Sequence, residues 1–528
     1  MDSFNLSGIT PFVGLQPESG LFQIQERTYQ YLLLLSGVCI AFTSLVQILN
    51  SRKLSVNVPS EGRTGKFDLY GGAYRFIKDG RAILLGGYNK YKLDTFKIPG
   101  VERWTVIINK QELIEEIRKA PADYFSLNEA TSEQFASRWT LGTSVFSENF
   151  HVNVVRNQLT RCLTARFDDV YDELSHSFDV LVPAKEDGWL TVPALRTMQK
   201  IVCRTSNRIF CGLPLCRDED YIELNINLTV DVINVSNELS KIPEMLKPIV
   251  GPLITTIPKR FKQGMKHLRP ILENRFRLYE QYGNDYPNKP ADMITWLIEE
   301  APENMKRDVI DLTKRILAIN FAAIHTSANS FTHALYHLAA EPDKYVAPLR
   351  EEVERVIDEE GWTKGAMTKL WKLDSFMKES QRFNGINLLA LNRKVLKDYT
   401  LSDGTFLPVG TFVAANVTGT HRDSAFYEKP DEFDGFRFAN IREGSSEEEL
   451  KHQMVQTSSD YLAFGHGRLA CPGRFFAVNE LKAMMAYVLL NYDVKLEKEG
   501  IRPSNIYKGI RLLPNPTAKL MFKKRKVA

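Results

Sequence analysis

A single cysteine stands where its sulfur would be activated. Residues 464–473 read Phe-Gly-His-Gly-Arg-Leu-Ala-Cys-Pro-Gly, and a strongly helical run follows over 474–490. Cys471 would therefore lie at the positive end of a helix dipole, beside unpaired backbone N–H groups, and both effects favour thiolate over thiol. Gly465 and Gly467 allow a tight turn and the close approach of a flat partner. Such a thiolate suits the axial ligand of a haem iron; a buried structural cysteine is the simpler alternative.

A second group with chemical potential lies in the middle of a long helix. The segment from Asp308 to Ala340 ends before Pro342 and is apolar nearly all round in its middle, so it should run through the core. The Thr326 hydroxyl can bond a carbonyl one turn earlier, which bends the helix and opens a place for water. His325 precedes it, and on this segment alone it is either a packed residue or a neutral imidazole that relays protons.

Composition limits the classes of function. The chain has 528 residues, 44% of them hydrophobic, a net charge of +4 and only six cysteines. A large core is possible, the charge does not indicate nucleic acid, and the sparse cysteines suit a reducing compartment. No Gly-rich flavin or nicotinamide fingerprint is present. The sequence therefore gives no sign of a flavin or nicotinamide site of its own.

Together these segments resemble the cytochrome P-450 monooxygenases, and in particular their fungal kaurene-oxidase-like group. Four positions of the cysteine loop match that family's haem-binding loop: Phe464, Gly467, Cys471 and Gly473. The family commonly has an arginine two residues before the cysteine, where this chain has Leu469. The resemblance implies haem b with Cys471 as the iron ligand, and Arg468 as a substitute for the missing propionate arginine.

The resemblance also assigns the residues that handle protons. In this family the long helix carries an acid followed by a threonine that helps to deliver protons during oxygen activation. His325 replaces the acid here, as in fungal relatives, and Thr326 matches the threonine. Thr326 and His325 are therefore the candidate catalytic residues, with the relay open between them.

Further positions follow from the family's order of motifs. Glu379 and Arg382 lie three apart on a helix around 371–383 and can pair, and in the family such a pair locks onto an arginine that matches Arg437. Charges buried together need mutual hydrogen bonds, so this triad should be structural. The candidates for binding the haem propionates are the strand residue Arg393, with Arg156 and His151 from a basic helix. A solvated basic face is the alternative for that helix.

Local patterns predict several other elements. A β-branched run over 104–108 indicates a strand, and 111–120 a helix. A hairpin is expected from strands 399–402 and 412–415 around the turn at Asp403-Gly404. The apolar stretch 243–258, broken by prolines, is either a core loop or, as in the family, a cap that dips toward the membrane.

The fold implied is mainly α with a smaller β region, preceded by one N-terminal transmembrane helix. We expect a lumenal segment over 1–28, an anchor over 29–50 and a cytosolic haem-thiolate monooxygenase domain over 51–528. The anchor segment has no charge and is long enough to span a hydrocarbon core of about 30 Å, although a buried helix is the alternative. Basic residues follow it, which places the catalytic domain in the cytosol and the protein in the endoplasmic reticulum membrane as a single-pass protein.

The activity implied is oxygen insertion into an apolar small molecule, a terpenoid or steroid-like intermediate of fungal secondary metabolism. NADPH would act indirectly through NADPH-cytochrome reductase, with cytochrome b5 as a further partner. Arg468, Arg474 and Lys482 are expected to form the docking face for the acidic reductase. Two alternatives remain open: a haem-thiolate isomerase or dehydratase that does not use O2, against which Thr326 counts, and a non-catalytic haem-binding membrane protein.

Overall fold

The computed structural model describes residues 34, 36, 37, 56–62, 69–92, 94–100, 103–442 and 450–526. The chain divides into two compact units, residues 1–53 and 54–528, and the description below concerns the second. The anchor expected over 29–50 lies outside the described residues, apart from 34, 36 and 37, which are helical. None of the helices that the structure describes combines the length and the apolar character needed to cross a membrane.

The second unit is mainly helical, with helices of very different lengths. The helices before the central one are α2 (Leu69–Tyr91), α3 (Gln111–Lys119), α4 (Leu127–Gln134), α5 (Ser144–Ser147), α6 (Phe150–Val154), α7 (Thr160–Cys162), α8 (Phe167–Leu181), α9 (Ala194–Phe210), α10 (Glu219–Leu239), α11 (Lys247–Ile254), α12 (Ile257–Tyr282) and α13 (Met293–Glu300). The central helix and those after it are α14 (Val309–Ala340), α15 (Pro342–Glu360), α16 (Lys364–Lys369), α17 (Trp371–Phe383), α18 (Val417–Thr420), α19 (Arg437–Arg442) and α21 (Arg474–Asn491).

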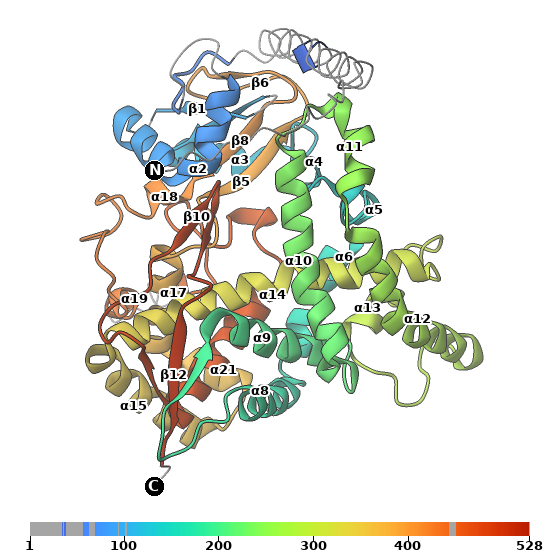
Figure 1. Ribbon diagram of the computed structural model, residues 1–528, viewed down its shortest axis with the longest axis vertical. Helices are drawn as coiled ribbons and strands as arrows, with labels where there is room; N and C mark the ends of the chain where they lie inside the picture. The colour runs from blue at the N-terminus through green and yellow to red at the C-terminus, as the bar shows by residue number, and fades with distance from the viewer. Residues whose placement is uncertain are drawn as a thin grey trace, which may run out of the picture. The chain divides into compact units, whose positions relative to one another are not determined.

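The long central helix was predicted almost to the residue. α14 has 32 residues, and its first turn is capped by the Asp308 carboxylate, which accepts bonds from the backbone N–H groups of Ile310 and Asp311. Pro342 starts the next helix, since proline fits a first turn but cannot continue a helix. α14 packs against α9, α10, α12, α17 and α21. Figure 1 shows it crossing the middle of this unit.

The strands form one larger and three smaller sheets. The five-stranded sheet has the order β1 (Phe96–Pro99), β2 (Trp104–Ile108), β8 (Phe412–Asn416), β5 (Leu389–Val395) and β3 (Phe125–Ser126). β2 and β8 are parallel, with Ile107 opposite Ala414, and the other pairs are antiparallel. The three-stranded sheet has the order β4 (Leu190–Pro193), β12 (Lys519–Lys524) and β9 (Tyr492–Leu496). The two-stranded ones are β6 (Tyr399–Thr400) with β7 (Phe406–Leu407), and β10 (Ile506–Lys508) with β11 (Arg511–Leu513).

The predicted strand over 104–108 is confirmed as β2, but the predicted hairpin is wrong in its second strand. β6 pairs with β7 and not with 412–415. The latter residues belong to β8, where Val413, Ala414 and Ala415 are buried between β2 and β5. Their small apolar side chains suit a central strand, and the sequence signal of the turn does not tell where the returning strand ends.

Candidate active site

The cysteine loop is held in shape by its own backbone. The Cys471 N–H donates to the Phe464 carbonyl at 2.8 Å, and Ala470 N–H donates to Gly467 O at 3.0 Å. Gly467 has a φ of 76°, and a Cβ there would clash with the side chain of Arg118 on α3. Glycine is therefore required at this position both for its backbone conformation and for space.

The loop is also tied to α3 by side chains that the sequence analysis missed. His466 Nε2 lies 2.8 Å from Glu115 Oε1, and Arg118 Nη2 lies 2.7 Å from Glu115 Oε2. Phe464 packs against the largest apolar cluster. The loop is thus fixed on both sides, by α3 and by the core.

The Cys471 thiol is buried, although the residue as a whole keeps exposed surface. Burial raises the pKa of this thiol, while backbone N–H groups of Gly473 and Arg474 and the Arg474 charge act in the opposite direction. The residue nevertheless keeps exposed surface. The expected preference for thiolate is therefore outweighed by burial in the protein alone, and a bound metal cation would restore it.

Cations without carboxylate partners surround this loop. Arg393 on β5 is 3% exposed, and its guanidinium donates to the neighbouring Asn392 carbonyl at 2.9 Å. Burial, with a smaller effect of the Arg468 charge, lowers the pKa of Arg393 to about 10. Arg156 donates to the Arg468 carbonyl at 3.4 Å. No carboxylate among the described residues pairs with these three arginines, so the surroundings of the cysteine fit a group that brings its own carboxylates, as haem does with its propionates.

The structure separates the two basic candidates of the segment after residue 149. His151 Nδ1 lies 3.1 Å from Arg315 Nη1 of α14, and burial followed by the Arg315 charge lowers the pKa of His151 to about 4. A neutral histidine engaged with Arg315 offers no positive charge to an anion. Arg156, one turn later, is the one of the two that reaches the cysteine loop.

At the centre of α14 the predicted back-bond is confirmed. The Thr326 hydroxyl donates to Ala322 O at 2.7 Å and to Ala323 O at 3.1 Å. Ala322 is exposed although it lies in the middle of a helix that is otherwise mostly buried. This stretch of α14 therefore faces open space, as a surface beside a flat cofactor or a substrate must.

His325 is engaged on both ring nitrogens. Nε2 lies 2.9 Å from the Ile226 carbonyl of α10, so it carries the proton, and Nδ1 lies 3.3 Å from Gln199 Nε2 of α9. Burial is the main cause that lowers the pKa of His325. A neutral imidazole thus joins three helices, and these contacts favour the packing interpretation over the relay.

A buried acid that the sequence analysis missed connects α21, which packs against α14, with α9. Glu480 accepts a hydrogen bond from Ser206 of α9 at 2.7 Å, and Ser327, the residue after Thr326, acts on its carboxyl by lowering its pKa. Among the described residues, the Oε2 atom of Glu480 has no hydrogen-bond partner, and burial raises the pKa of this carboxyl to about 8. The signal was present in the sequence, since Glu480 is the only acid in the apolar run 474–490.

The three residues expected to be structural lie together. Arg382 Nη2 is 2.7 Å from Glu379 Oε1, and Arg437 Nε is 3.2 Å from the same atom. Both members of the α17 pair are fully enclosed. Arg382 also donates to the carbonyls of His421 and Pro430, at 2.5 and 2.9 Å. The triad therefore fixes the chain between α17 and α19 and does not reach the cysteine through any of these contacts.

Lys482 is not part of a docking surface, which corrects the expectation. Its side chain is 4% exposed and pairs with Asp374 at 2.9 Å, and Arg442 lies 3.2 Å from the same carboxylate. The residue lies on an α21 face that turns toward α17. Of the three docking candidates, Arg468 and Arg474 keep surface exposure.

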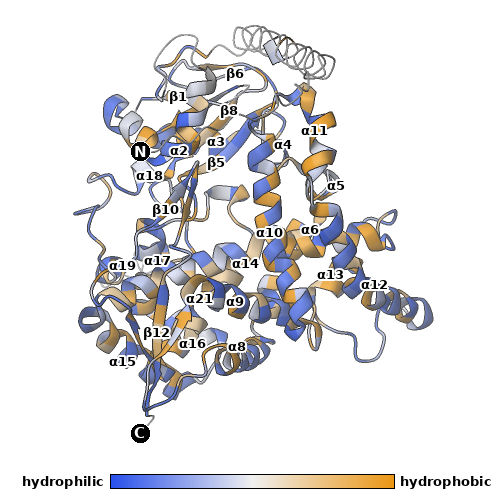
Figure 2. Ribbon diagram, viewed as in Figure 1, coloured by the Kyte–Doolittle hydropathy of each residue, from blue (hydrophilic) through white to orange (hydrophobic). Residues whose placement is uncertain are grey.

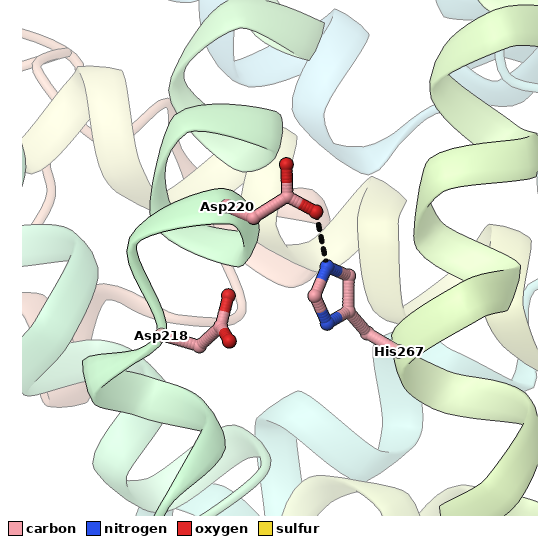
Figure 3. A group of neighbouring side chains, drawn as sticks. All are labelled: Asp218, Asp220 and His267. Atoms are coloured by element: carbon pink, nitrogen blue, oxygen red, sulfur yellow. Dashed lines mark hydrogen bonds and ion pairs between the residues drawn. The ribbon is translucent and has the colours of Figure 1, made fainter.

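A second cluster has the composition of a metal site but a structural explanation. Asp218, Asp220 and His267 lie together between α10 and α12 (Figure 3). Asp218 caps α10 by accepting from the Tyr221 N–H at 2.8 Å, and His267 Nε2 lies 2.7 Å from Asp220 Oδ2. Lys266 already supplies a cation 3.5 Å from that oxygen. We assign no metal to this cluster.

Comparison with known proteins agrees with the arrangement around Cys471. Residues 88–522 match the sequence pattern of the family described as cytochrome P450. The chain is 44% identical to cytochrome P450 monooxygenase 151 of Postia placenta over 469 residues, which cover 89% of this chain and 94% of the relative. It is 33% identical to an ent-kaurene oxidase of Gibberella intermedia over 486 residues, covering 91% and 90%.

Proposed function

Because this chain belongs to the cytochrome P450 family, we propose that Cys471 is its haem ligand and that it oxidises an apolar terpenoid or steroid-like molecule of fungal secondary metabolism. Membership in the family makes the chain an oxygen-using oxidoreductase that works with haem, a cysteine thiolate and electrons delivered from NADPH by a reductase. The observation that carries the assignment is the place of Cys471, in a glycine turn held by the Phe464 carbonyl just before α21, with three arginines nearby that lack carboxylate partners among the described residues. The terpenoid substrate rests on the likeness to an ent-kaurene oxidase.

We propose distinct roles for the arginines near this loop. Arg393, Arg468 and Arg156 would hold the two haem propionates, because each is a cation that lacks a carboxylate partner among the described residues. Phe464 and Gly467 would shape the face against which the ring lies. When bound, haem supplies the activation of O2.

Thr326 is the group that we propose to move a proton. Its hydroxyl now donates to two carbonyls of its own helix, and rotation about χ1 would release it toward the open space beside Ala322. His325 would hold α14 against α9 and α10 through its two ring nitrogens. Proton transfer by a positioned side chain, here the Thr326 hydroxyl, commonly contributes about 100-fold to 10,000-fold to a rate.

We propose that the protein lies at the endoplasmic reticulum membrane, anchored by 29–50, with 1–28 lumenal and 51–528 cytosolic. Three apolar side chains support contact at a second place: Met245, Ile249 and Leu253 are 49%, 67% and 79% exposed. They lie on α11 and the turn before it, where Figure 2 shows strongly apolar ribbon. Solvent-exposed apolar residues on consecutive turns are typical of a surface that rests on lipid. Cytochrome b5 is proposed as a second electron donor beside the reductase.

The test is a carbon-monoxide difference spectrum of the reduced protein, followed by turnover with NADPH and reductase. A thiolate-type spectrum together with oxygenated product supports the proposal. A thiolate-type spectrum with a product formed without O2 or NADPH would instead indicate an isomerase or dehydratase. The same spectrum without any turnover would indicate a non-catalytic haem protein.

A further inference from the structure

A cavity away from the cysteine loop has a lining that suits an anion. It has a volume of about 370 Å³ and lies where the end of α10, the start of α11, the β10–β11 hairpin and the sheet strands β2 and β8 meet. Its lining contains five cations and two carboxylates: Arg103, Lys241, Lys247, Lys508, Arg511, Glu133 and Glu238. Figure 1 labels α10, α11, β8 and β10 among these elements.

Most of these charges are already neutralised by ion pairs. Arg103 lies 2.6 Å from Glu133, and Lys241 lies 2.6 Å from Glu238. Lys247 lies 2.5 Å from Glu244, just outside the cavity. Among the described residues, no carboxylate pairs with Arg511, so its guanidinium is a half-buried cation without a carboxylate partner.

Arg511 is held in place by backbone hydrogen bonds of its two neighbours in the chain. On either side of it, Leu388 N–H donates to Ile510 O at 2.7 Å and Leu512 N–H donates to Ile386 O at 3.0 Å. The bond from its side chain, Nη1 to Asn237 Oδ1, is long at 3.4 Å. Burial alone lowers the pKa of Arg511. The strand thus fixes a guanidinium that makes one weak polar contact.

Asn237 supplies a second donor without a partner. Its Nδ2 atom is buried and has no hydrogen bond among the described residues. Since Nδ2 and Oδ1 belong to one planar amide, this N–H group lies next to the Arg511 guanidinium. Buried donors are almost always bonded in native proteins, so the unbonded Asn237 N–H, beside a guanidinium with one weak polar contact, indicates a missing acceptor.

We propose that Arg511 and Asn237 form a subsite for the carboxylate of an apolar acid. A guanidinium fork and an amide N–H match the two oxygens of a carboxylate. Ile77, Phe412 and Ile510 give the same cavity apolar walls, and its volume falls in the range of small-molecule sites. The inference rests on the proposed function, because it names an acid group as the polar end of the substrate that the enzyme oxidises.

The experiment is a calorimetric titration of the haem-loaded, full-length protein at about pH 8 with dodecanoate and with dodecanol. Both probes have the same chain, and only the first is an anion. One charge-assisted contact predicts that dodecanoate binds about 10-fold to 100-fold more tightly than dodecanol. Arg511→Gln and Asn237→Asp should both abolish this preference, the second because its carboxylate would pair with Arg511. Equal affinity for the two probes in the wild type, or a preference that survives Arg511→Gln, overturns the proposal.

Lys508→Gln is the matched control, since it removes one charge from an exposed residue of the same lining. The Lys508→Gln variant should keep most of the preference for dodecanoate over dodecanol. If it loses as much of that preference as Arg511→Gln does, the preference comes from the general positive charge of the lining and not from a subsite, which also overturns the proposal. The carbon-monoxide spectrum of every variant reports separately on the fold and on the haem-thiolate centre. A protein without that spectrum that still prefers dodecanoate would sink the proposed function and leave the subsite standing.

Discussion

Replacing Glu480 by glutamine should make the stability of the protein respond differently to pH. The carboxyl has a pKa of about 8 in the folded chain against an ordinary 4.5, because it is buried. Below pH 4.5 it is protonated in both the folded and the unfolded chain. As pH rises toward 8, the unfolded chain releases this proton and the folded chain keeps it, so the free energy of unfolding falls.

The size of the effect follows from the pKa difference of 8 minus 4.5, or 3.5 units. At about 1.36 kcal/mol per unit, the ceiling is about 5 kcal/mol over the whole interval and about 1.4 kcal/mol for each pH unit inside it. Glu480→Gln keeps an oxygen that can accept the Ser206 bond but cannot ionise. The variant should therefore gain on the wild type as pH rises from 5 to 8.

The assay is the melting temperature of the haem-loaded, detergent-solubilised protein at several values between pH 5 and pH 8. For a chain of this size we expect the difference between Glu480→Gln and wild type to grow by about 1–2 °C for each pH unit. Glu303→Gln is the control, because that side chain is 86% exposed, and its difference from wild type should stay flat. A Glu480→Gln difference that is constant, or that shrinks with rising pH, would refute the reasoning.

The remaining predictions concern the site, the fold and the membrane. Cys471→Ser should abolish both the thiolate-type spectrum and turnover, because a neutral hydroxyl cannot replace the anionic sulfur; a serine variant that still oxygenates would disprove the assignment. Thr326→Ala should keep the spectrum but lower the product formed per NADPH consumed, with a rate loss near 100-fold or less because water can replace the hydroxyl. His325→Ala should lower the melting temperature through loss of the α9–α10–α14 contacts while coupling stays near wild type, and peroxide release at the Thr326→Ala level would restore the relay interpretation. Glu379→Ala should cost about 3–5 kcal/mol, since it leaves Arg382 buried without its partner, so folded protein should be nearly absent at 37 °C and recovery by Glu379→Gln should be incomplete. Deletion of 1–50 should release the protein from membranes only in part, because the exposed apolar residues of α11 retain affinity, and unchanged retention after alkaline washing would contradict the anchor.

Local signals in the sequence predicted the elements that carry the chemistry. The bounds of α14, the strand β2 and the start of α21 follow from periodicity, a capping aspartate and prolines, all of which act within a few residues. The cysteine loop was recognisable for the same reason. The bounds of these elements and the shape of the loop depend on residues that are close together in the sequence.

What the sequence did not predict depends on packing between distant segments. Lys482 and Glu480 are charged residues of the kind that usually lies on the surface, and only the packing of α21 against α17, α9 and α14 shows that they are buried. In the sequence, His151 and Arg156 are equal candidates for binding a haem propionate. The contact of His151 with Arg315, more than a hundred residues later in the chain, distinguishes them. That Arg511 lacks a carboxylate partner among the described residues follows from the ion pairs of the neighbouring acids, which the sequence alone does not show.

The guanidinium of Arg382 has a consequence for how this chain can change in evolution. The segment between α18 and α19 contains no helix or strand, and its path is set by carbonyls of His421, Pro430 and Glu432, which all accept hydrogen bonds from the Arg382 side chain. Because backbone atoms make these contacts, exchanging an exposed side chain of the segment, such as Glu428 or Lys429, would leave them in place. An inserted or deleted residue would move the carbonyls away from a buried cation. The segment should therefore tolerate substitution at its exposed positions while keeping a fixed length.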